Sequence, residues 1–245
     1  MKYILTLLLI FFNLQAEDKK QNLIIGAGAF FQSQPYENVD ATILPSPVIF
    51  FDNSIIYIQW SRAGVYFLGD RDEDFAWGFS LTAQPRVYGY KADDIAGMDE
   101  RRKTFEGGLA FSTKKGPAHL ELMLLTDILN RHDSWILKSE MGVDFKIGDF
   151  SFYPSLILVY ESSKFLNYYY GVKKSEELKN RKAYTPNDGL SVGIQTYIKY
   201  PITKDISTLV NLRIDKLSNE ATSSPIVNED YLYSGLLSLI YTFKY

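Results

Sequence analysis

Residues 233–245 read YSGLLSLIYTFKY, and this stretch decides the fold. Every second residue back from the carboxyl end is aromatic, aliphatic or glycine, namely Tyr245, Phe243, Tyr241, Leu239, Leu237, Gly235 and Tyr233. The residues between them are mostly polar. Because side chains alternate between the two faces of a strand, the stretch predicts a strand with one apolar and one polar face. Such a strand is typical of a barrel wall that separates lipid from a polar lumen.

The two ends of the chain indicate the same compartment. The carboxyl end resembles the terminal signal by which outer-membrane barrels are recognised for insertion, with the positions Gly235, Tyr241, Phe243 and Tyr245. At the amino end a short basic start precedes an apolar run, and residues 13–16 offer a cleavage site before Glu17. The run is shorter than the about 20 apolar residues that a membrane-spanning helix needs. We therefore predict a cleaved signal peptide over residues 1–16 and a single barrel domain over residues 17–245.

Composition removes several classes of function. The formal net charge is −3, which argues against nucleic acid as a partner because such proteins usually carry a basic patch. The chain has no cysteine, which excludes disulfides, thiolate metal sites and a lipid-anchored cysteine. Aromatic residues make up 15% of the chain, with 18 Tyr and 16 Phe, and this suits aromatic girdles at two membrane interfaces.

Alternation between apolar and polar residues recurs along the chain. It is strong over residues 75–84, 104–112, 134–146, 190–200 and 206–215, and weaker over 23–32, 42–51, 55–68, 118–127 and 150–161. A soluble β-sandwich also alternates, but its strands are shorter and its charged face is exposed. Here a charge turned toward lipid would cost about 2–4 kcal/mol at the midplane, so the charged faces must point inward. The sequence predicts an all-β, transmembrane antiparallel β-barrel of the bacterial outer membrane.

The number of strands stays open between 10 and 12, since a bacterial barrel has an even count. Ten strands result if residues 150–172 form one long strand and residues 42–51 lie outside the main wall. Twelve result if residues 47–57 form a hairpin that turns at Asp52 and Asn53. In either case short connections predict periplasmic turns at 114–116, 147–149 and 203–205, and longer polar ones predict outward loops at 91–103, 128–133, 173–189 and 218–230.

Charged residues on the polar faces form the main candidate site. The inward candidates are Arg86, Glu106, Glu121, Lys138, Glu140, Asp144, Lys199, Arg213, Asp215 and Lys244. Unpaired charges in a small lumen lose hydration without compensation, so opposite charges on neighbouring strands should pair. One hypothesis is a mixed-charge network that narrows or closes the interior. The other is a small water-filled pore whose selectivity these charges tune.

Signals for catalysis, cofactors and metals are weak. The only histidines are His119 and His132, and the run Arg131-His132-Asp133-Ser134 makes a poor triad because adjacent residues point in different directions. Two histidines without cysteine are a weak case for zinc. Glycines near residue 26 lack the third glycine of a dinucleotide motif, and the acidic run at 70–74 lacks the glycine and spacing of a calcium loop. We therefore expect no enzyme activity, no cofactor and no metal.

Several motifs together give the chain a family resemblance. The motifs are Tyr168-Tyr169-Tyr170-Gly171-Val172, Tyr184-Thr185-Pro186-Asn187-Asp188, Leu217-Ser218-Asn219-Glu220, Ser223-Ser224-Pro225-Ile226-Val227, and upstream Leu44-Pro45-Ser46-Pro47-Val48-Ile49 and Asp99-Glu100-Arg101-Arg102-Lys103. In this order they resemble the MipA/OmpV family of outer-membrane proteins, named for the MltA-interacting protein. The resemblance covers residues 26–245, which is nearly the whole mature chain.

The resemblance implies a barrel in the outer membrane of Gram-negative bacteria with no known catalytic activity. The named member of the family is described as a scaffold that joins a lytic murein transglycosylase to a penicillin-binding protein. The resemblance thus implies a scaffold for murein-remodelling enzymes, with outer-membrane lipid as its surroundings. A passive narrow pore for small solutes is the alternative. The resemblance carries over no binding residues for a partner.

Overall fold

A computed structural model describes residues 22–71 and 75–244. The predicted signal peptide lies outside these residues, as does Tyr245 of the predicted insertion signal. The strands are β1 Asn22–Gln32, β2 Thr42–Asp52, β3 Ile56–Gln59, β4 Arg62–Arg71, β5 Phe75–Arg86, β6 Thr104–Lys115, β7 Ala118–Asp127, β8 Trp135–Val143, β9 Phe145–Ile147, β10 Phe150–Glu161, β11 Gly189–Pro201, β12 Ile206–Lys216 and β13 Tyr231–Lys244. The helices are α2 Ser163–Tyr170, the 3-10 turn η2 Lys174–Glu176 and α3 Asn219–Thr222.

The strands form one antiparallel sheet that closes on itself. Apart from β8 and β9, each strand pairs with its sequence neighbour. β1 pairs with β13, and β10 pairs with β11 across the long connection that contains α2. β8 and β9 both pair with β10 and are two parts of one wall strand, interrupted at Asp144. Pro154 lies opposite that interruption, and a proline has no N–H to donate to the ladder there. The described chain is therefore a closed barrel of twelve wall strands, which confirms the predicted fold class.

The ten-strand alternative is wrong in both of its parts. The strand that begins at Phe150 ends at Glu161, because Ser162 turns the chain into α2, whose apolar face is buried. Residues 42–51 belong to the wall as β2, which pairs with β1 from Thr42 to Phe50. The hairpin that turns after Asp52 is confirmed, with the Asn53 side chain accepting hydrogen bonds from the N–H groups of Ile55 and Ile56.

The expected strand over residues 55–68 is instead a short hairpin. β3 and β4 are joined by a turn at Trp60 and Ser61, and Trp60 has the left-handed φ of +56°. The left-handed region favours glycine, asparagine and aspartate, so a tryptophan at this position gives no turn signal in the sequence. The result is a hairpin whose first strand, β3, has four residues, against eleven in β2 and twelve in β5.

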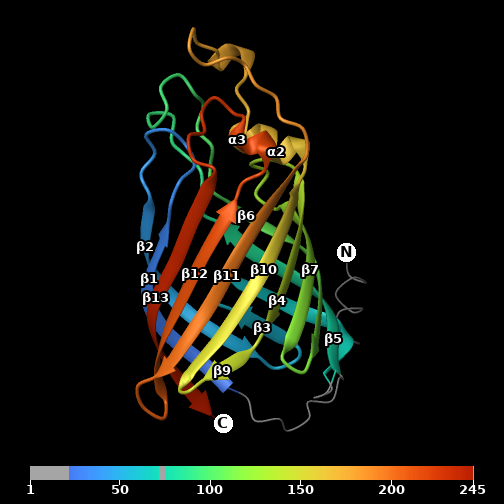
Figure 1. The fold of residues 1–245 in the computed structure, drawn as a ribbon. Helices are drawn as coiled ribbons and strands as arrows, with labels where there is room; N and C mark the ends of the chain where they lie inside the picture. Colours follow the sequence, from blue (N-terminus) through green and yellow to red (C-terminus); the bar gives the residue numbers. More distant parts are fainter. Residues whose placement is uncertain (1–21, 72–74, 245) are drawn as a thin grey trace, which may run out of the picture.

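The two ends of the barrel differ. Short turns and both ends of the described chain lie at one end, and α2, α3 and the long loops lie at the other (Figure 1). Bacterial barrels place short turns in the periplasm and long loops outside, so the end with the short turns is the periplasmic end. Exposed aromatic side chains mark both rims of the outer wall. Those on the loop side are Phe31, Phe105, Trp135, Tyr160 and Tyr233, and those on the turn side are Phe75, Phe145, Phe150, Tyr241 and Phe243.

The last strand alternates as its sequence predicts. On β13, Leu237, Leu239, Tyr241 and Phe243 are exposed on the outer wall, whereas Leu236, Ser238 and Ile240 are buried in the lumen. Burying an apolar residue inside the barrel was not expected, because the sequence suggested a polar lumen. Leu236 and Ile240 pack with Val48 and Leu209 into a small apolar cluster against the wall made by β12, β13, β1 and β2.

A second and larger apolar core closes the outer mouth of the barrel. The aromatic side of α2 fills it, and Phe165, Leu166, Tyr169 and Tyr170 are fully buried. Side chains from the segments that follow β1, β5, α2 and β12 complete this cap, namely Tyr36, Tyr88, Tyr90, Ile95, Met98, Val172, Leu217, Ala221 and Ile226. None of the helices in the described part of the chain is long and apolar enough to cross a membrane.

Candidate functional site

The lumen below the cap holds a cavity of about 910 Å³. Side chains from nearly all strands line it, including Arg62 of β4, Arg86 of β5, Glu121 of β7 and Tyr197 of β11. Charged groups gather on the wall made by β4 to β12, and apolar groups gather on the wall made by β12, β13, β1 and β2. The cavity is therefore amphipathic from one side to the other.

Most of the predicted lumen charges meet a partner of opposite sign. Arg86 pairs with Glu106 on the adjacent strand, and Arg213 contacts Asp215 at 2.7 Å. Lys138 lies 3.6 Å from Glu140, whose carboxylate also accepts hydrogen bonds from Ser155 and Gln195. Low polarity around these pairs makes each attraction strong and makes each unpaired charge costly, so the pairing is expected on physical grounds.

Three predicted lumen positions lie nearer the periplasmic rim. Asp144 and Lys244 are largely exposed, and their partners are the rim residues Lys114 and Asp205. Lys199 lines the lower part of the cavity and is half-buried. These positions are inward on the pleat, but the barrel ends close to them and water reaches their charges.

Arg62 and Glu161 are two charged lumen residues that the sequence analysis did not select. Arg62 pairs with Glu121 across the lumen and also contacts Gln59. It follows the unexpected turn at residue 60, so its face could not be assigned from the pattern. Glu161 is the last residue of β10 and accepts a hydrogen bond of 2.8 Å from Ser191 on β11. Alternation along residues 150–161 was the only signal that could have identified it.

The two histidines have structural surroundings. His119 stacks on Tyr153 with ring centroids 4.2 Å apart, and its ring covers Gly142 on the neighbouring strand. His132 is buried beside Phe165, and its Nδ1 lies 2.6 Å from the Oγ of Ser134. Within residues 22–71 and 75–244, no cluster of three or more His, Asp and Glu side chains could hold a metal ion.

The loop that carries His132 is organised by one carboxylate. The Oδ2 atom of Asp127 accepts hydrogen bonds from the backbone N–H groups of Arg131, His132 and Asp133. The Asp133 carboxylate instead pairs with Lys164 at the surface. Burial and the nearby Arg86 lower the pKa of His132 despite the opposing effect of Asp127 and Glu106, so the ring is neutral at pH 7. Asp133 and His132 are therefore not arranged as an acid–base pair.

The resemblance motifs that follow β5, α2 and β12 build the cap, whereas the motif over residues 44–49 lies in β2 of the wall. Val172 and Tyr184 exchange two backbone hydrogen bonds, and the Oγ of Ser224 donates to the carbonyl of Tyr170 at 2.5 Å. Tyr169 and Pro186 are buried, and Pro225 is exposed. The motifs outside β2 thus correspond to contacts that hold the loops to α2.

Two further motif residues fix the ends of that segment. The Asp188 carboxylate accepts hydrogen bonds from the N–H of Ser163 and the hydroxyl of Tyr160. The N–H of Asn187 donates to Glu220 beside α3. At Gly171 a Cβ would lie 2.3 Å from the carbonyl oxygen of Asn167, so only glycine fits directly after α2. These contacts join the long loop to both helices.

One buried ion pair joins two of the cap loops. Arg101 lies 3.1 Å from Glu176, and both side chains are only 4% exposed. Burial alone would raise the pKa of Glu176. The backbone N–H groups of Lys173 and Asp99, together with Arg101, reverse that effect and hold the pKa below its ordinary value. The pair is charged at neutral pH and connects the loop before β6 to the loop after α2.

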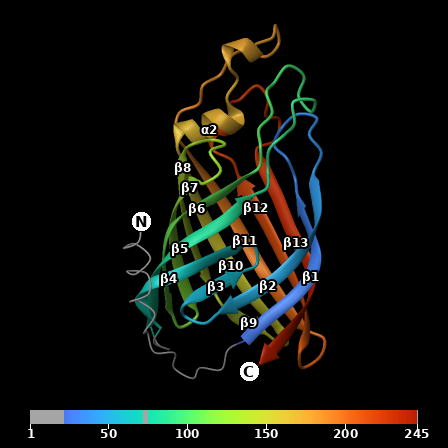
Figure 2. The ribbon, with the colours of Figure 1, turned by 180° about the vertical axis from the view of Figure 1, so that it is seen from behind.

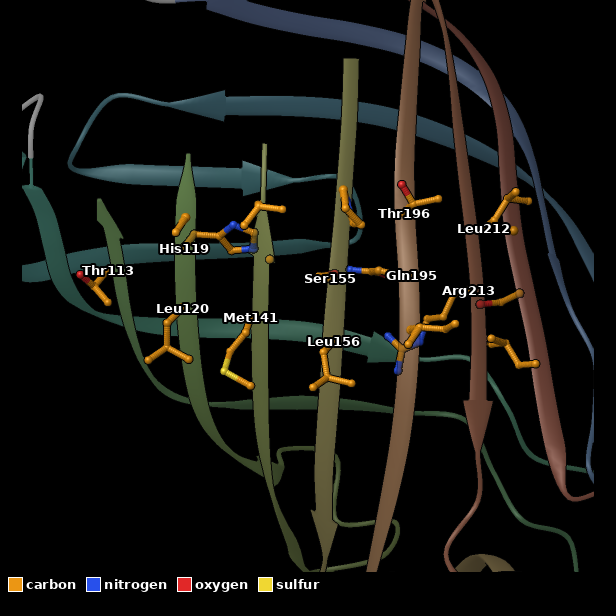
Figure 3. A pocket seen from close by; sticks show the side chains of 18 of the residues that line it. Thr113, His119, Leu120, Met141, Ser155, Leu156, Gln195, Thr196, Leu212 and Arg213 are labelled. Atoms are coloured by element: carbon orange, nitrogen blue, oxygen red, sulfur yellow. The ribbon is translucent and has the colours of Figure 1, made fainter. Parts of the chain in front are cut away.

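A hollow of about 1310 Å³ follows the wall from β6 to β12. Figure 3 shows side chains of its lining on consecutive positions, such as His119 and Leu120 on β7 and Ser155 and Leu156 on β10. Its apolar members, among them Met141, are exposed on the outer wall. In a membrane these side chains meet acyl chains, so the charged lumen is the better candidate for specific chemistry.

Comparison with known proteins agrees with this architecture. A family model described as "MltA-interacting protein MipA" matches residues 25–243. The MltA-interacting protein of Escherichia coli (strain K12) is 26% identical over 90% of this chain and 89% of its own length. The outer membrane protein OmpV of Vibrio cholerae is 28% identical over 66% of this chain and 63% of its own length.

Among solved structures, the chain is similar to the COG4313 outer membrane channel from Pseudomonas putida F1. The TM-score is 0.45 at 10% identity, over 95% of this chain and 98% of the channel. The family match spans most of the chain, and the barrel is of the outer-membrane type. The chain belongs to the MipA/OmpV family of outer-membrane β-barrel proteins, named for the MltA-interacting protein.

Proposed function

We propose that this barrel is a non-enzymatic scaffold that holds murein-remodelling enzymes at its periplasmic face. The observation that carries the proposal is the cap, whose buried aromatic core fills the outer mouth. A barrel closed on the outside is better suited to presenting its periplasmic end than to passing solutes. The name of the Escherichia coli relative, MltA-interacting protein, supports the same assignment.

The partners in this proposal are a lytic murein transglycosylase and a penicillin-binding protein. The periplasmic end of the barrel presents three exposed lysines, with Lys115 at the end of β6, Lys146 in β9 and Lys204 in the turn before β12. These exposed lysines attract an acidic patch on a partner and increase the rate of encounter. The structural surroundings of His132 and Asp133 support the absence of catalysis in the proposal.

A pull-down from detergent-solubilised outer membranes tests this function. We expect the tagged wild-type barrel to retain a lytic murein transglycosylase. The triple variant Lys115→Glu, Lys146→Glu and Lys204→Glu should retain about tenfold less, because rim charges contribute about 0.2–1 kcal/mol each.

A matched control reverses three exposed lysines at the opposite end, with Lys91→Glu, Lys164→Glu and Lys179→Glu. This control should retain as much enzyme as the wild type, which separates the periplasmic rim from a general charge effect. If the wild-type barrel captures no murein enzyme under conditions that keep it folded, the scaffold assignment is wrong.

A passive narrow pore is the second candidate, and the cavity of about 910 Å³ with its charged lining favours it. Planar-bilayer recordings distinguish the two functions. Stable, ion-selective conductance steps from the wild-type barrel would support the pore, and silence under the same conditions would support the scaffold.

A further inference from the structure

The wall of the barrel is incomplete between β2 and β5. β2 pairs with β3 only at residues 50–52, and β4 pairs with β5 only from Ala63 opposite Ala83 downward. In the described part of the chain, residues 42–48 of β2 and 84–86 of β5 therefore have a strand neighbour on one side alone. We call the interval bounded by these two edges and the turn at Trp60 the notch.

The strands on either side of the notch are adapted to an open edge. Pro45 and Pro47 lie on the free edge of β2, and Pro85 lies on the free edge of β5. A proline has no N–H, and each of the three residues replaces a donor that would have no strand to bond. An unsatisfied N–H facing hydrocarbon costs several kcal/mol, so these prolines make an unpaired edge tolerable inside a membrane.

The notch lies at the depth of the outer leaflet. Its upper margin includes Ile43, which is the register partner of Phe31 in the loop-side aromatic girdle and is 70% exposed. Its floor is the turn at Trp60, whose N–H donates to the carbonyl of Ile49 at 2.8 Å. β2 and β5 are separated by three strand spacings where the hairpin lies between them, which is about 14 Å. In Figure 2 the far strands β10 and β11 are seen between β2 and β5.

The notch is continuous with the cavity in the lumen. Side chains of both edges line that cavity, with Leu44 and Ser46 from β2 and Gln84 from β5. Leu44 is the register partner of Phe30 on the inner face of the wall, yet 39% of it is exposed. An inward leucine is exposed to this extent because no wall strand covers it. The lumen can therefore be reached sideways, at a place that the cap does not close.

The lumen wall beside the notch is apolar and therefore suits an acyl chain. Trp60 packs edge to face on Phe30 with centroids 5.4 Å apart, and its Nε1 donates to the Oγ of Ser46 at 2.9 Å. This pair adjoins the apolar cluster of Leu209, Leu236 and Ile240 on the lumen wall. An acyl chain that enters over Trp60 thus meets a continuous apolar surface.

The charges near the notch select the head group. The two guanidinium groups at its margins are Arg62 and Arg86, and each already pairs with a carboxylate, Glu121 or Glu106. No surplus positive charge remains at these two positions to bind an anionic head. A head group without net charge, rich in hydrogen-bonding atoms, fits the opposite wall better.

We propose that the notch is a lateral opening through which the acyl chain of an uncharged or zwitterionic amphiphile enters the lumen from the outer leaflet. This binding site goes beyond the scaffold function and does not depend on it. The site combines an apolar entrance at Trp60 with a polar, charge-balanced far wall.

Fluorescence quenching tests the proposal, because Trp60 lies inside the barrel and the other two tryptophans lie in the outward-facing pattern of their strands. The double variant Trp77→Phe and Trp135→Phe leaves Trp60 as the only tryptophan. Reconstituted into phosphatidylcholine vesicles with brominated acyl chains, this protein should lose emission relative to unbrominated vesicles. The loss should be comparable to that of a protein that keeps only Trp135, which is exposed to lipid.

Two outcomes would overturn the proposal. In the first, brominated lipid quenches Trp135 but not Trp60. If aqueous iodide also fails to quench Trp60, the lumen is sealed, and if iodide quenches it, the lumen is filled with water. In the second, a single tryptophan placed at Tyr153, inside the barrel on β10, is quenched as strongly as Trp60. Equal quenching at both sites would mean that the chains do not enter at the notch. Heat-dependent gel mobility confirms that each variant is folded.

Discussion

Single residues decide how charge is tolerated inside this barrel. The inward arginines Arg62, Arg86 and Arg213 each have a carboxylate partner, and the cap repeats the arrangement with Arg101 and Glu176. Removing one member of a buried pair leaves an uncompensated charge, so the cost of breaking such a pair exceeds its net contribution when intact. The pair in the cap is the easiest to test because it lies outside the membrane.

The Glu176 carboxylate should make cap stability depend on pH. Its pKa in the folded protein lies below the ordinary value of 4.5, because hydrogen bonds and Arg101 outweigh burial. A carboxyl group with a lowered folded pKa contributes stability above its unfolded pKa and loses it as the pH falls through the folded pKa. Limited proteolysis of the loop around residue 176 should therefore be slow above about pH 4.5 and accelerate below it.

Glu176→Gln should reduce the stability of the closed cap at neutral pH by up to about 3–5 kcal/mol, because it leaves Arg101 without its partner. It should also remove this pH dependence. Glu177→Gln is the matched control, since Glu177 pairs with the exposed lysines Lys174 and Lys182 and should change stability by less than about 1 kcal/mol. Equal protease resistance of both variants would contradict the role given to Glu176.

At the scale of elements, the short hairpin of β3 and β4 is the feature that distinguishes this wall. It turns at a left-handed tryptophan, so residues 42–48 of β2 and 84–86 of β5 extend beyond it with a free edge. A free edge invites pairing with another chain, and prolines are one of the devices that prevent it. Pro45 and Pro47 supply that device on β2.

Replacing both prolines by valine should therefore make the barrel associate. The variant Pro45→Val with Pro47→Val restores two N–H donors, and each hydrogen bond to a second chain contributes about 0.5–1.5 kcal/mol. We expect a shift toward dimers in detergent, measured by chemical cross-linking and size-exclusion chromatography. Pro201→Val, at the end of β11 and away from the notch, should leave the distribution of species unchanged. Identical elution of all three proteins would argue against an edge-protecting role.

At the scale of the whole molecule, the sheet closes around the lumen everywhere but at the notch, and the cap closes the outer mouth. β1 and β13 pair over eleven residues, which joins the first and last strands. The cap depends on α2, whose side chains Phe165, Leu166, Tyr169 and Tyr170 are fully buried between the loops. The proposed scaffold function rests on the second closure, because the cap fills the outer mouth and leaves the periplasmic end to present to partners.

Phe165→Ala should loosen the cap without unfolding the barrel. Truncating a buried phenylalanine costs about 3–5 kcal/mol, and the wall strands do not depend on this contact. We expect intermittent conductance steps in planar bilayers where the wild type is silent. Lys164→Ala, on the exposed side of the same helix, should remain as silent as the wild type. Steady conductance of the wild type would show that the cap does not seal the lumen.

Much of the architecture could be predicted because neighbouring residues in the sequence show which face of a strand is apolar. The alternation at residues 233–245 predicts an outer wall of leucine and aromatic residues, and β13 has that wall. Charged residues at inward positions, such as Arg86 and Glu106, could be selected in the same way, since lipid excludes them. Loop lengths likewise predicted which end carries the long connections.

Periodicity along the sequence thus determined the class of fold and the facing of most strands by itself. The tertiary structure alone decided the number of wall strands, the turn at Trp60, the pairing of Arg62 with Glu121, and the meeting of α2 with Tyr36 in the cap. The physical reason is the distance along the sequence between the residues that interact. Which face of a strand is apolar depends on neighbours two residues away, whereas closure, the notch and the cap depend on contacts between segments tens to hundreds of residues apart.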